Sequence, residues 1–270
     1  MESCTNMNYR DVTNLKTYPM SVDGNATKTV VIDHIDKELL ILKNQKIIKG
    51  KPGNDQISEY LACNILKICG YDVQDTKLVY YKGLLVVAIV LKNEITQLKQ
   101  VRSYFTDESR ILYDLDYIYS LTETLKSKID IERFKEHIRK LVLVSYVFCN
   151  VDLHPGNIGF NKINGKYEPS EIYDLGGSFL SAYAEDIDKL RSVEKSLETK
   201  VRLSARDYNV LEYITKEELQ GINKKLIENK EKIKELINTL PEGFREYGEV
   251  CYQIAVKRSS VDFSSPLNWE

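Results

Sequence analysis

The sequence predicts an α+β fold in two parts: a β-rich N-terminal part, residues 1–95, and an α-rich C-terminal part, residues 96–270. Short aliphatic and β-branched runs crowd the N-terminal part, whereas apolar residues recur at helical spacing in much of the C-terminal part. At 270 residues the chain is long enough for one large domain or two lobes with a buried core.

Four or five strands are predicted in the N-terminal part, and four of them can be placed. Residues 28–43, KTVVIDHIDKELLILK, contain two aliphatic runs separated by the polar residues 34–37, which predicts two strands and a turn. Residues 76–81 and 84–91 predict a second hairpin, whose turn lies at the Lys-Gly pair between them.

One helix is predicted between these hairpins. Apolar residues recur at helical spacing from 57 to 68, after the loop GKPGND at 50–55. Gly70 is placed to cap the C-terminal end of this helix, and Asn54 or Asp55 is placed to cap its start.

Long helices are predicted in the C-terminal part, and residues 186–270 are expected to be helical cover. Residues 131–148 form an amphipathic pattern, and residues 186–200 and 215–240 are also helical in character, the last ending before Pro241. The Lys/Glu-rich part of the last segment predicts a solvated helix face, because apolar residues still mark a buried stripe.

The composition bears on location and on binding partners. With 38 basic and 40 acidic residues the net charge is −2, which argues against a nucleic-acid binder that relies on bulk positive charge. No apolar run approaches the ~20 residues of a membrane-spanning helix, and the polar start lacks a signal-peptide centre. Five cysteines without metal-site spacing predict reduced thiols in a cytoplasmic protein, with non-classical secretion left open.

A polar cluster lies in VDLHPGNIGF, residues 151–160, and EIYDLGGSF, residues 171–179. Phosphoryl transfer from ATP needs a carboxylate that orients the attacking hydroxyl, and Mg²⁺ prefers carboxylate and amide oxygens. The cluster therefore predicts Asp152 as base or orienting group, with Asn157 and Asp174 as Mg²⁺ ligands. Any one of these residues alone is more typical of a turn or cap, but the set at this spacing favours a functional site.

A hairpin would bring this cluster together. Residues 158–160 and 171–173 are apolar enough for two strands, with a turn around 164–165, and such a hairpin returns Asp174 beside Asn157. His154 lies between Asp152 and Asn157. For His154 a structural role in the loop and a contact with phosphate stay equally open.

A phosphate-binding region is predicted in the N-terminal part. Lys43 ends a strand, and Glu59 in the following helix is placed to hold it, as a strand lysine and a helix glutamate do in protein kinases. The alternative is that both are unrelated surface charges. The polar segment SVDGNATK, residues 21–28, precedes the first strand and lacks the second glycine of a Walker loop. Its candidate nucleotide-binding residues are Ser21, Gly24, Asn25 and Lys28.

At these residues the sequence resembles the HipA-like kinases, in particular the compact CtkA-like branch. CNVDLHPGNIGF is similar to the catalytic loop N-x-D-R-H-x-x-N-x-G-F, and IYDLGGSF is similar to the metal-binding segment. SEYLACNILKICGYDVQDTKLVYYKGLLVVA resembles the S-E-Y helix and hairpin, and SVDGNATKTVVI the phosphate loop. The resemblance covers about residues 20–182 and implies a two-lobed protein-kinase-like fold, related to phosphatidylinositol kinases.

The resemblance also implies an activity: use of ATP and Mg²⁺ to phosphorylate serine or threonine on a protein substrate. By matching position, Asp152 is the catalytic base, Asn157 and Asp174 are the metal ligands, and Lys43 is the phosphate-binding lysine with Glu59 as its partner. One departure is Leu153, which stands where the family usually has arginine.

Three functions remain open from the sequence. The first is the serine/threonine kinase, with Ser21 and Thr27 as candidate autophosphorylation sites. The second is a small-molecule kinase, because DLHPGN is also similar to the catalytic loop of aminoglycoside phosphotransferases. The third is a nucleotide-binding pseudokinase that acts as a binding module with a regulatory or antitoxin-like partner. None of the three predicts binding to nucleic acid or membrane.

Overall fold

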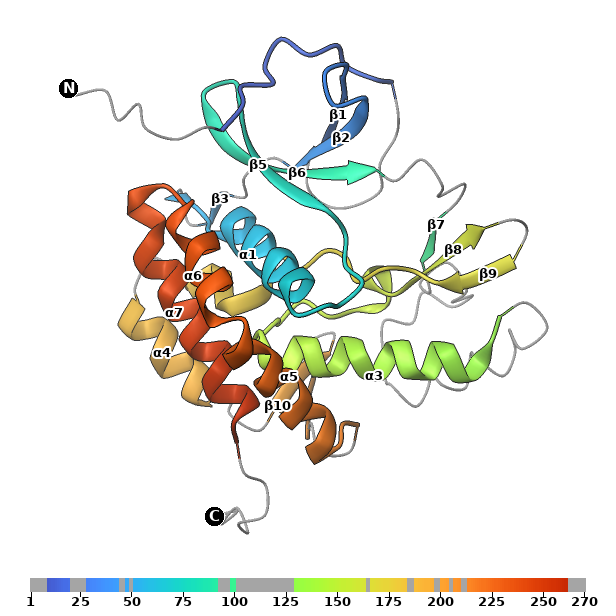
Figure 1. The fold of residues 1–270 in the computed structure, drawn as a ribbon, viewed down its shortest axis with the longest axis vertical. Helices are drawn as coiled ribbons and strands as arrows, with labels where there is room; N and C mark the ends of the chain where they lie inside the picture. The colour runs from blue at the N-terminus through green and yellow to red at the C-terminus, as the bar shows by residue number, and fades with distance from the viewer. Residues whose placement is uncertain are drawn as a thin grey trace.

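A β-rich layer lies above a helical layer, with helix α1 (Asp55–Ile68) between them (Figure 1). The computed structural model describes residues 9–19, 28–43, 47–48, 51–91, 98–100, 129–163, 166–183, 187–196, 200–203, 206–209 and 213–261. This arrangement confirms the predicted α+β class. Within these ranges no helix has the length and apolar character that crossing a bilayer requires.

The N-terminal layer is a four-stranded antiparallel sheet in the order β1-β2-β6-β5. Its strands are β1 (Lys28–Asp33), β2 (Glu38–Lys43), β5 (Thr76–Tyr81) and β6 (Leu84–Leu91). Both predicted hairpins are confirmed. The β5–β6 turn has Lys82 and Gly83 at φ 51° and 77°, the left-handed conformation that a two-residue hairpin turn of type I′ requires.

An N-terminal segment that the sequence did not reveal covers both edges of this sheet. The backbone N–H of Val12 donates to the carbonyl of Tyr80 in β5 (2.8 Å), and the N–H of Tyr18 donates to Val30 in β1 (2.8 Å). The segment thereby satisfies backbone groups that edge strands otherwise leave unpaired.

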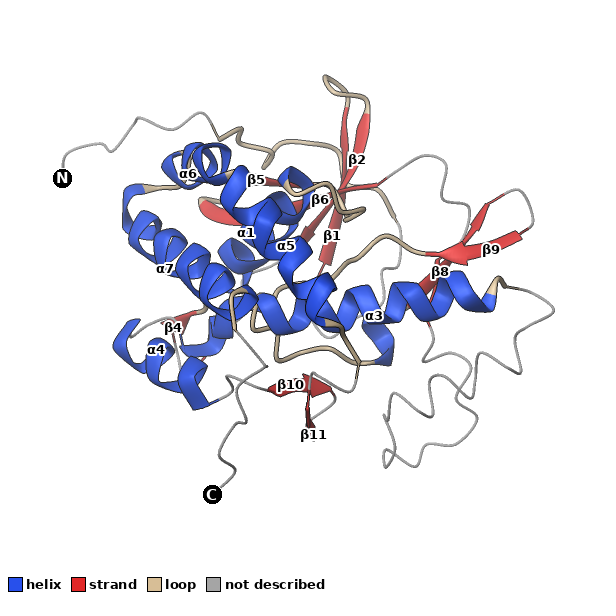
Figure 2. Cartoon of the chain, turned by 60° about the horizontal axis from the view of Figure 1, so that its bottom comes forward, coloured by secondary structure: helices blue, strands red, loops and turns tan. Residues whose placement is uncertain are grey.

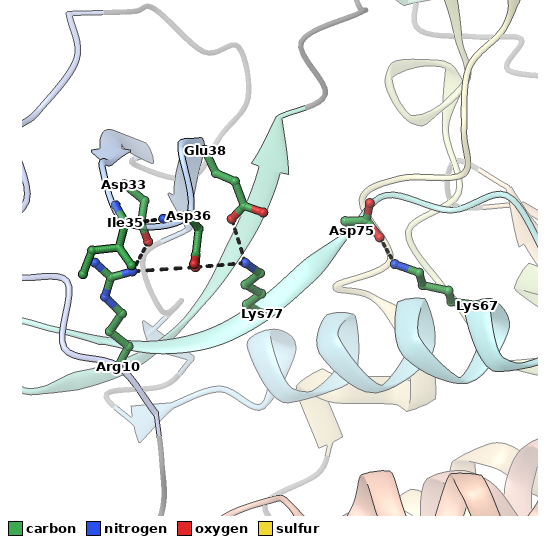
Figure 3. A network of polar contacts seen from close by, with 8 residues as sticks. All are labelled: Arg10, Asp33, Ile35, Asp36, Glu38, Lys67, Asp75 and Lys77. Atoms are coloured by element: carbon green, nitrogen blue, oxygen red, sulfur yellow. Dashed lines mark hydrogen bonds and ion pairs between the residues drawn. The ribbon is translucent and has the colours of Figure 1, made fainter.

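Charged side chains fasten this segment to the β1–β2 turn (Figure 3). Arg10 bonds to Asp33, which also accepts from the backbone N–H of Asp36 (3.2 Å). Lys77 in β5 pairs with Asp36 (3.5 Å) and with Glu38 (2.7 Å). Burial acts to raise the pKa of Asp33, but the bonds from Arg10 and the turn backbone hold that pKa below its ordinary value.

Helix α1 (Asp55–Ile68) confirms the predicted helix and its C-terminal cap. Gly70 has φ 77°, and its N–H donates to the carbonyl of Lys67 (2.9 Å), which completes a Schellman motif. The prediction of a side-chain cap at the start is wrong: Asn54 occupies the N-cap position without a side-chain capping bond. The hydroxyl of Ser58 donates instead to the Asn54 carbonyl (2.8 Å).

The hairpin predicted from residues 158–160 and 171–173 exists, but with a different second strand. Strand β8 (Gly159–Ile163) pairs with β9 (Lys166–Pro169) and with β7 (Leu98–Gln100). Residues 171–173 follow β9 rather than forming it, and Ile172 makes an isolated parallel bridge to Val73. The expected turn residues 164–165 lie outside the described ranges. The hairpin lies near the N-terminal end of helix α3 (Ile131–Val147), as Figures 1 and 2 show.

The helical layer confirms most of the predicted helices and adds one. The predicted helix 215–240 is interrupted at Asn229, and the predicted helix 186–200 ends earlier. Figure 2 shows α4 to α7 gathered at the C-terminal end of α3. The helices are α3 (Ile131–Val147), α4 (Ile187–Ser196), α5 (Lys216–Glu228), α6 (Lys230–Asn238) and α7 (Glu242–Ser259).

Short elements complete the described chain. The small hairpins were not predicted, and α7 was expected only as part of the helical cover over residues 186–270. The hairpin strands are β3 (Ile47–Ile48) with β4 (Lys51–Pro52), and β10 (Lys200–Leu203) with β11 (Arg206–Asn209). The short helical turns are η2 (Pro155–Asn157) and η3 (Ser178–Tyr183).

Candidate active site

Three charged side chains, from β2, α1 and the loop after β9, meet at the end of β2. The Nζ atom of Lys43 donates to Oε1 of Glu59 in α1 (2.6 Å) and to Oδ1 of Asp174 (2.6 Å). Lys43 is 8% exposed and Glu59 is 2% exposed, whereas the Asp174 side chain is 42% exposed. The expected contact between Lys43 and Glu59 is therefore present, and the half-exposed Asp174 also pairs with Lys43.

The electrostatics keep Lys43 charged. Burial acts to lower the pKa of Lys43, but the Glu59 and Asp174 carboxylates outweigh burial and raise that pKa overall. Burial raises the pKa of Glu59, against the opposing effect of the Lys43 ammonium. A fixed ammonium beside a half-exposed carboxylate is suited to contact with a phosphate group.

Helix α1 is held in place on two sides. The side-chain Oε1 of Gln56 accepts from the backbone N–H of Val87 (3.1 Å), the residue directly across from Lys43 in the sheet. The hydroxyls of Ser58 and Tyr247 in α7 are 2.5 Å apart and buried. Sequence reasoning missed these contacts, because Tyr247 lies far along the chain and Gln56 is an ordinary helix residue.

The loop after α3 carries the predicted base. Asp152 is exposed, and its backbone N–H donates to the side-chain oxygen of Asn150 (3.1 Å). Asn157 is 4% exposed, and its Nδ2 donates to the Asp152 carbonyl (2.8 Å). Because that bond uses the amide nitrogen, Oδ1 is the Asn157 atom suited to a cation.

His154 contributes to the shape of this loop. Its Nδ1 accepts from the backbone N–H of Gly156 (3.0 Å) and thereby caps the short helix η2. A Cβ on Gly156 would lie 2.7 Å from the imidazole Cε1, so the ring occupies the space that a side chain there would need. These contacts favour the structural role over the phosphate contact, which stays a prediction.

The loop that bears Asp174 is joined to the Asp152 loop at two points. The Tyr173 hydroxyl donates to the carbonyl of Gly156 (2.9 Å), and the N–H of Val151 donates to the carbonyl of Gly177 (3.3 Å). Burial raises the pKa of Tyr173, so its hydroxyl stays a donor. Asp174 has φ 57°, a left-handed conformation that Asp tolerates better than most residues.

Comparisons with known proteins found similarity both in sequence and in fold. No family model matches the chain. Serine/threonine-protein kinase CtkA of Helicobacter pylori is 28% identical over 181 residues, which cover 61% of this chain and 51% of CtkA. The chain thus spans about half the length of this curated relative. A crystal structure of the Helicobacter pylori proinflammatory kinase CtkA matches with a TM-score of 0.68 at 19% identity, covering 93% of this chain and 98% of that one.

The chain therefore resembles CtkA in sequence, and it shares the fold of the HipA/CtkA-like kinases. Its fold also matches HipA of Shewanella oneidensis MR-1, solved as a toxin–antitoxin complex with HipB and operator DNA. That match has a TM-score of 0.52 at 14% identity and covers 89% of this chain and 64% of HipA. The predicted kinase-like fold is thereby confirmed.

Only part of the predicted phosphate loop lies within the described residues. Lys28 begins β1 directly across from Lys43, and residues opposite one another in a ladder share a face of the sheet. Lys28 therefore leaves the sheet on the same face as Lys43. The other nucleotide-binding candidates, Ser21, Gly24 and Asn25, lie outside the described ranges.

Leu153 takes an interior position where the HipA-like pattern has arginine. It is 2% exposed and belongs to the large core that α1, α3 and the C-terminal helices share. At this position the chain uses an apolar contact in place of a charge.

The predicted metal ligands fit Mg²⁺ bound together with a nucleotide. In the described ranges no three His, Cys, Asp or Glu residues gather as a metal site. Mg²⁺ at phosphate-transfer sites needs only one or two protein carboxylates, since phosphates and water complete its shell. The half-exposed carboxylate of Asp174 and Oδ1 of Asn157 meet that requirement.

Proposed function

We propose that the chain is an ATP- and Mg²⁺-dependent serine/threonine protein kinase. The observation that carries this proposal is the Lys43 ammonium, 2.6 Å from both Glu59 and Asp174. Protein kinases use a strand lysine paired with a helix glutamate, together with an aspartate that holds Mg²⁺. Homology to a serine/threonine kinase supports the same activity.

Each residue of the candidate site has its own role in the transfer step. A substrate hydroxyl attacks the γ-phosphorus, the bond from that phosphorus to the β–γ bridging oxygen breaks, and ADP leaves. Asp152 orients the hydroxyl and accepts its proton, and Lys43 contacts the phosphates. Asn157 and Asp174 would hold Mg²⁺, which neutralises phosphate charge when bound.

Labelled ATP tests this function. We expect purified chain with Mg²⁺ and γ-labelled ATP to label itself or an added basic protein, and Asp174→Asn to abolish the label. Intact mass would show whether the chain adds phosphate to itself, with Ser21 and Thr27 as the proposed sites. Absence of label despite Mg-ATP binding would contradict the proposal. ATP consumption would then indicate a small-molecule kinase, and no consumption would indicate a pseudokinase.

A regulatory partner also stays a proposal. HipA of Shewanella oneidensis was solved with HipB in a toxin–antitoxin complex. We propose that a regulatory, antitoxin-like partner acts on this chain.

Gly177 is expected to be required for transfer, because it lets the two loops approach. A Cβ at Gly177 would lie 2.6 Å from Cβ of Asp152 and 2.7 Å from the side-chain oxygen of Asn150, so the loops must move apart. We expect Gly177→Ala to lower the transfer rate by roughly a hundredfold, since displacing a catalytic group by ~1 Å can have that effect. Gly221→Ala is the control, because a Cβ there meets nothing within 4 Å. Equal rates for the two variants would refute this expectation.

A further inference from the structure

Gln74 connects two of the groups that surround Lys43. It lies between α1 and β5 and is 4% exposed. We infer that Gln74 is a positioning residue that holds Glu59 in its pairing with Lys43. This inference rests on the proposed kinase function and assigns a role to a residue outside the predicted site.

The side chain of Gln74 acts on Glu59 directly. Its Nε2 donates to Oε1 of Glu59 (2.7 Å), the same oxygen that accepts from Lys43 (2.6 Å). Hydrogen bonds to a buried carboxylate favour its charged form. As a neutral donor, Gln74 orients that carboxylate without competing with Lys43 as a cation.

The backbone of Gln74 is tied to the Asp174 segment. Its N–H donates to the carbonyl of Ile172 (2.9 Å), and the N–H of Ile172 donates to the backbone carbonyl of Asp72 (3.1 Å). Val73 and Ile172 form a parallel bridge between these bonds. Ile172 comes two residues before Asp174, so Gln74 links the segments that supply both carboxylates around Lys43.

Gln74 has a second side-chain contact that supplies a matched control. Its Nε2 lies 3.7 Å from Sγ of Cys63, one turn along α1 from Glu59. If Gln74 merely filled space at this place, loss of the thiol contact would matter as much as loss of the bond to Glu59. Cys63→Ala removes the thiol contact and leaves the bond to Glu59 in place.

Nucleotide affinity measures the effect of Gln74 on the phosphate site. We expect Gln74→Leu to weaken ATP binding by roughly tenfold to a hundredfold, as loss of a hydrogen bond to a charged group does. Adenosine affinity should stay at the wild-type level, because Lys43 acts on phosphates. Cys63→Ala should bind both as wild type does. A Gln74→Leu protein that binds ATP like wild type overturns the inference.

A double-mutant cycle tests whether Gln74 acts through Glu59. Gln74→Leu should weaken ATP binding in the wild-type chain but change it by less than about twofold in a Glu59→Gln background. A purely structural role predicts the same loss in both backgrounds, and that outcome would overturn the inference.

Labelling of Lys43 separates this inference from the kinase proposal. Acetic anhydride labels free amines, and peptide mass spectrometry can compare Lys43 with exposed lysines in one sample. We expect several-fold faster Lys43 labelling in folded Gln74→Leu than in wild type or Cys63→Ala. If wild type binds no ATP, the kinase proposal fails while this labelling still tests Gln74. If ATP is bound but labelling is unchanged, only the Gln74 inference fails.

Discussion

Replacing Asp152 by Asn should lower the rate of phosphoryl transfer by about 10²- to 10⁴-fold, the range that a general base contributes. Asp152 is exposed at the loop beside Gly177, while the Lys43 cluster is formed by other residues. ATP affinity should therefore stay near that of wild type. Single-turnover rates with labelled ATP, together with calorimetric ATP binding, measure the two quantities separately.

Asp188→Asn is the matched control for charge removal. Asp188 lies in the first turn of α4 with its side chain 96% exposed, and we expect its substitution to leave the transfer rate unchanged. If Asp152→Asn transferred phosphate as fast as Asp188→Asn, the assignment of Asp152 as base would be wrong.

Replacing Arg258 by Leu should lower the free energy of unfolding by about 3–5 kcal/mol, as breaking a buried ion pair does. Arg258 is 1% exposed at the end of α7. Its Nε donates to the carbonyl of Tyr146 (2.5 Å), its guanidinium lies 4.3 Å from the Tyr146 ring centroid, and it pairs with the buried Glu194 (3.5 Å). Chemical denaturation measures the loss.

The neighbouring Lys257 provides a control with the same partner. Lys257 also pairs with Glu194 (2.7 Å), but its side chain is 47% exposed. Lys257→Met should therefore cost less than about 1 kcal/mol, as exposed ion pairs do. A loss in Arg258→Leu no larger than in Lys257→Met would contradict the account. The double variant Arg258→Leu with Glu194→Leu should recover part of the stability, because the buried Glu194 carboxylate, which then has only the half-exposed Lys257 as its ion-pair partner, is also removed.

Local signals were sufficient for much of the fold. The β5–β6 turn needs two residues at positive φ, and Lys82-Gly83 supplies them. Gly70 likewise ends α1 because it adopts a left-handed conformation without a Cβ clash. These features depend on neighbours in the chain, which is why sequence patterns predicted them.

The sequence patterns did not delimit helix α7, because Gly248 within it has a tertiary purpose. Gly248 is a poor helix former in isolation. In the structure a Cβ there would lie 3.0 Å from Cδ1 of Leu240 and 3.1 Å from Cγ2 of Ile237, so glycine permits close packing on α6. The second strand of the C-terminal hairpin was misplaced for a related reason. Of residues 171–173, Ile172 does pair, but its partner is Val73, far away in the chain.

The sequence by itself determined the residue types of the candidate site. Asp152, Asn157 and Asp174 stand out by their spacing, and Lys43 with Glu59 by their places on a strand and a helix. Only the tertiary structure placed Lys43 between Glu59 and Asp174, and only the structure revealed Gln74. The physical reason is that short-range periodicity and turn conformation depend on residues that are neighbours in the chain. The contacts of a buried ammonium depend instead on packing that joins residues 43, 59, 74 and 174.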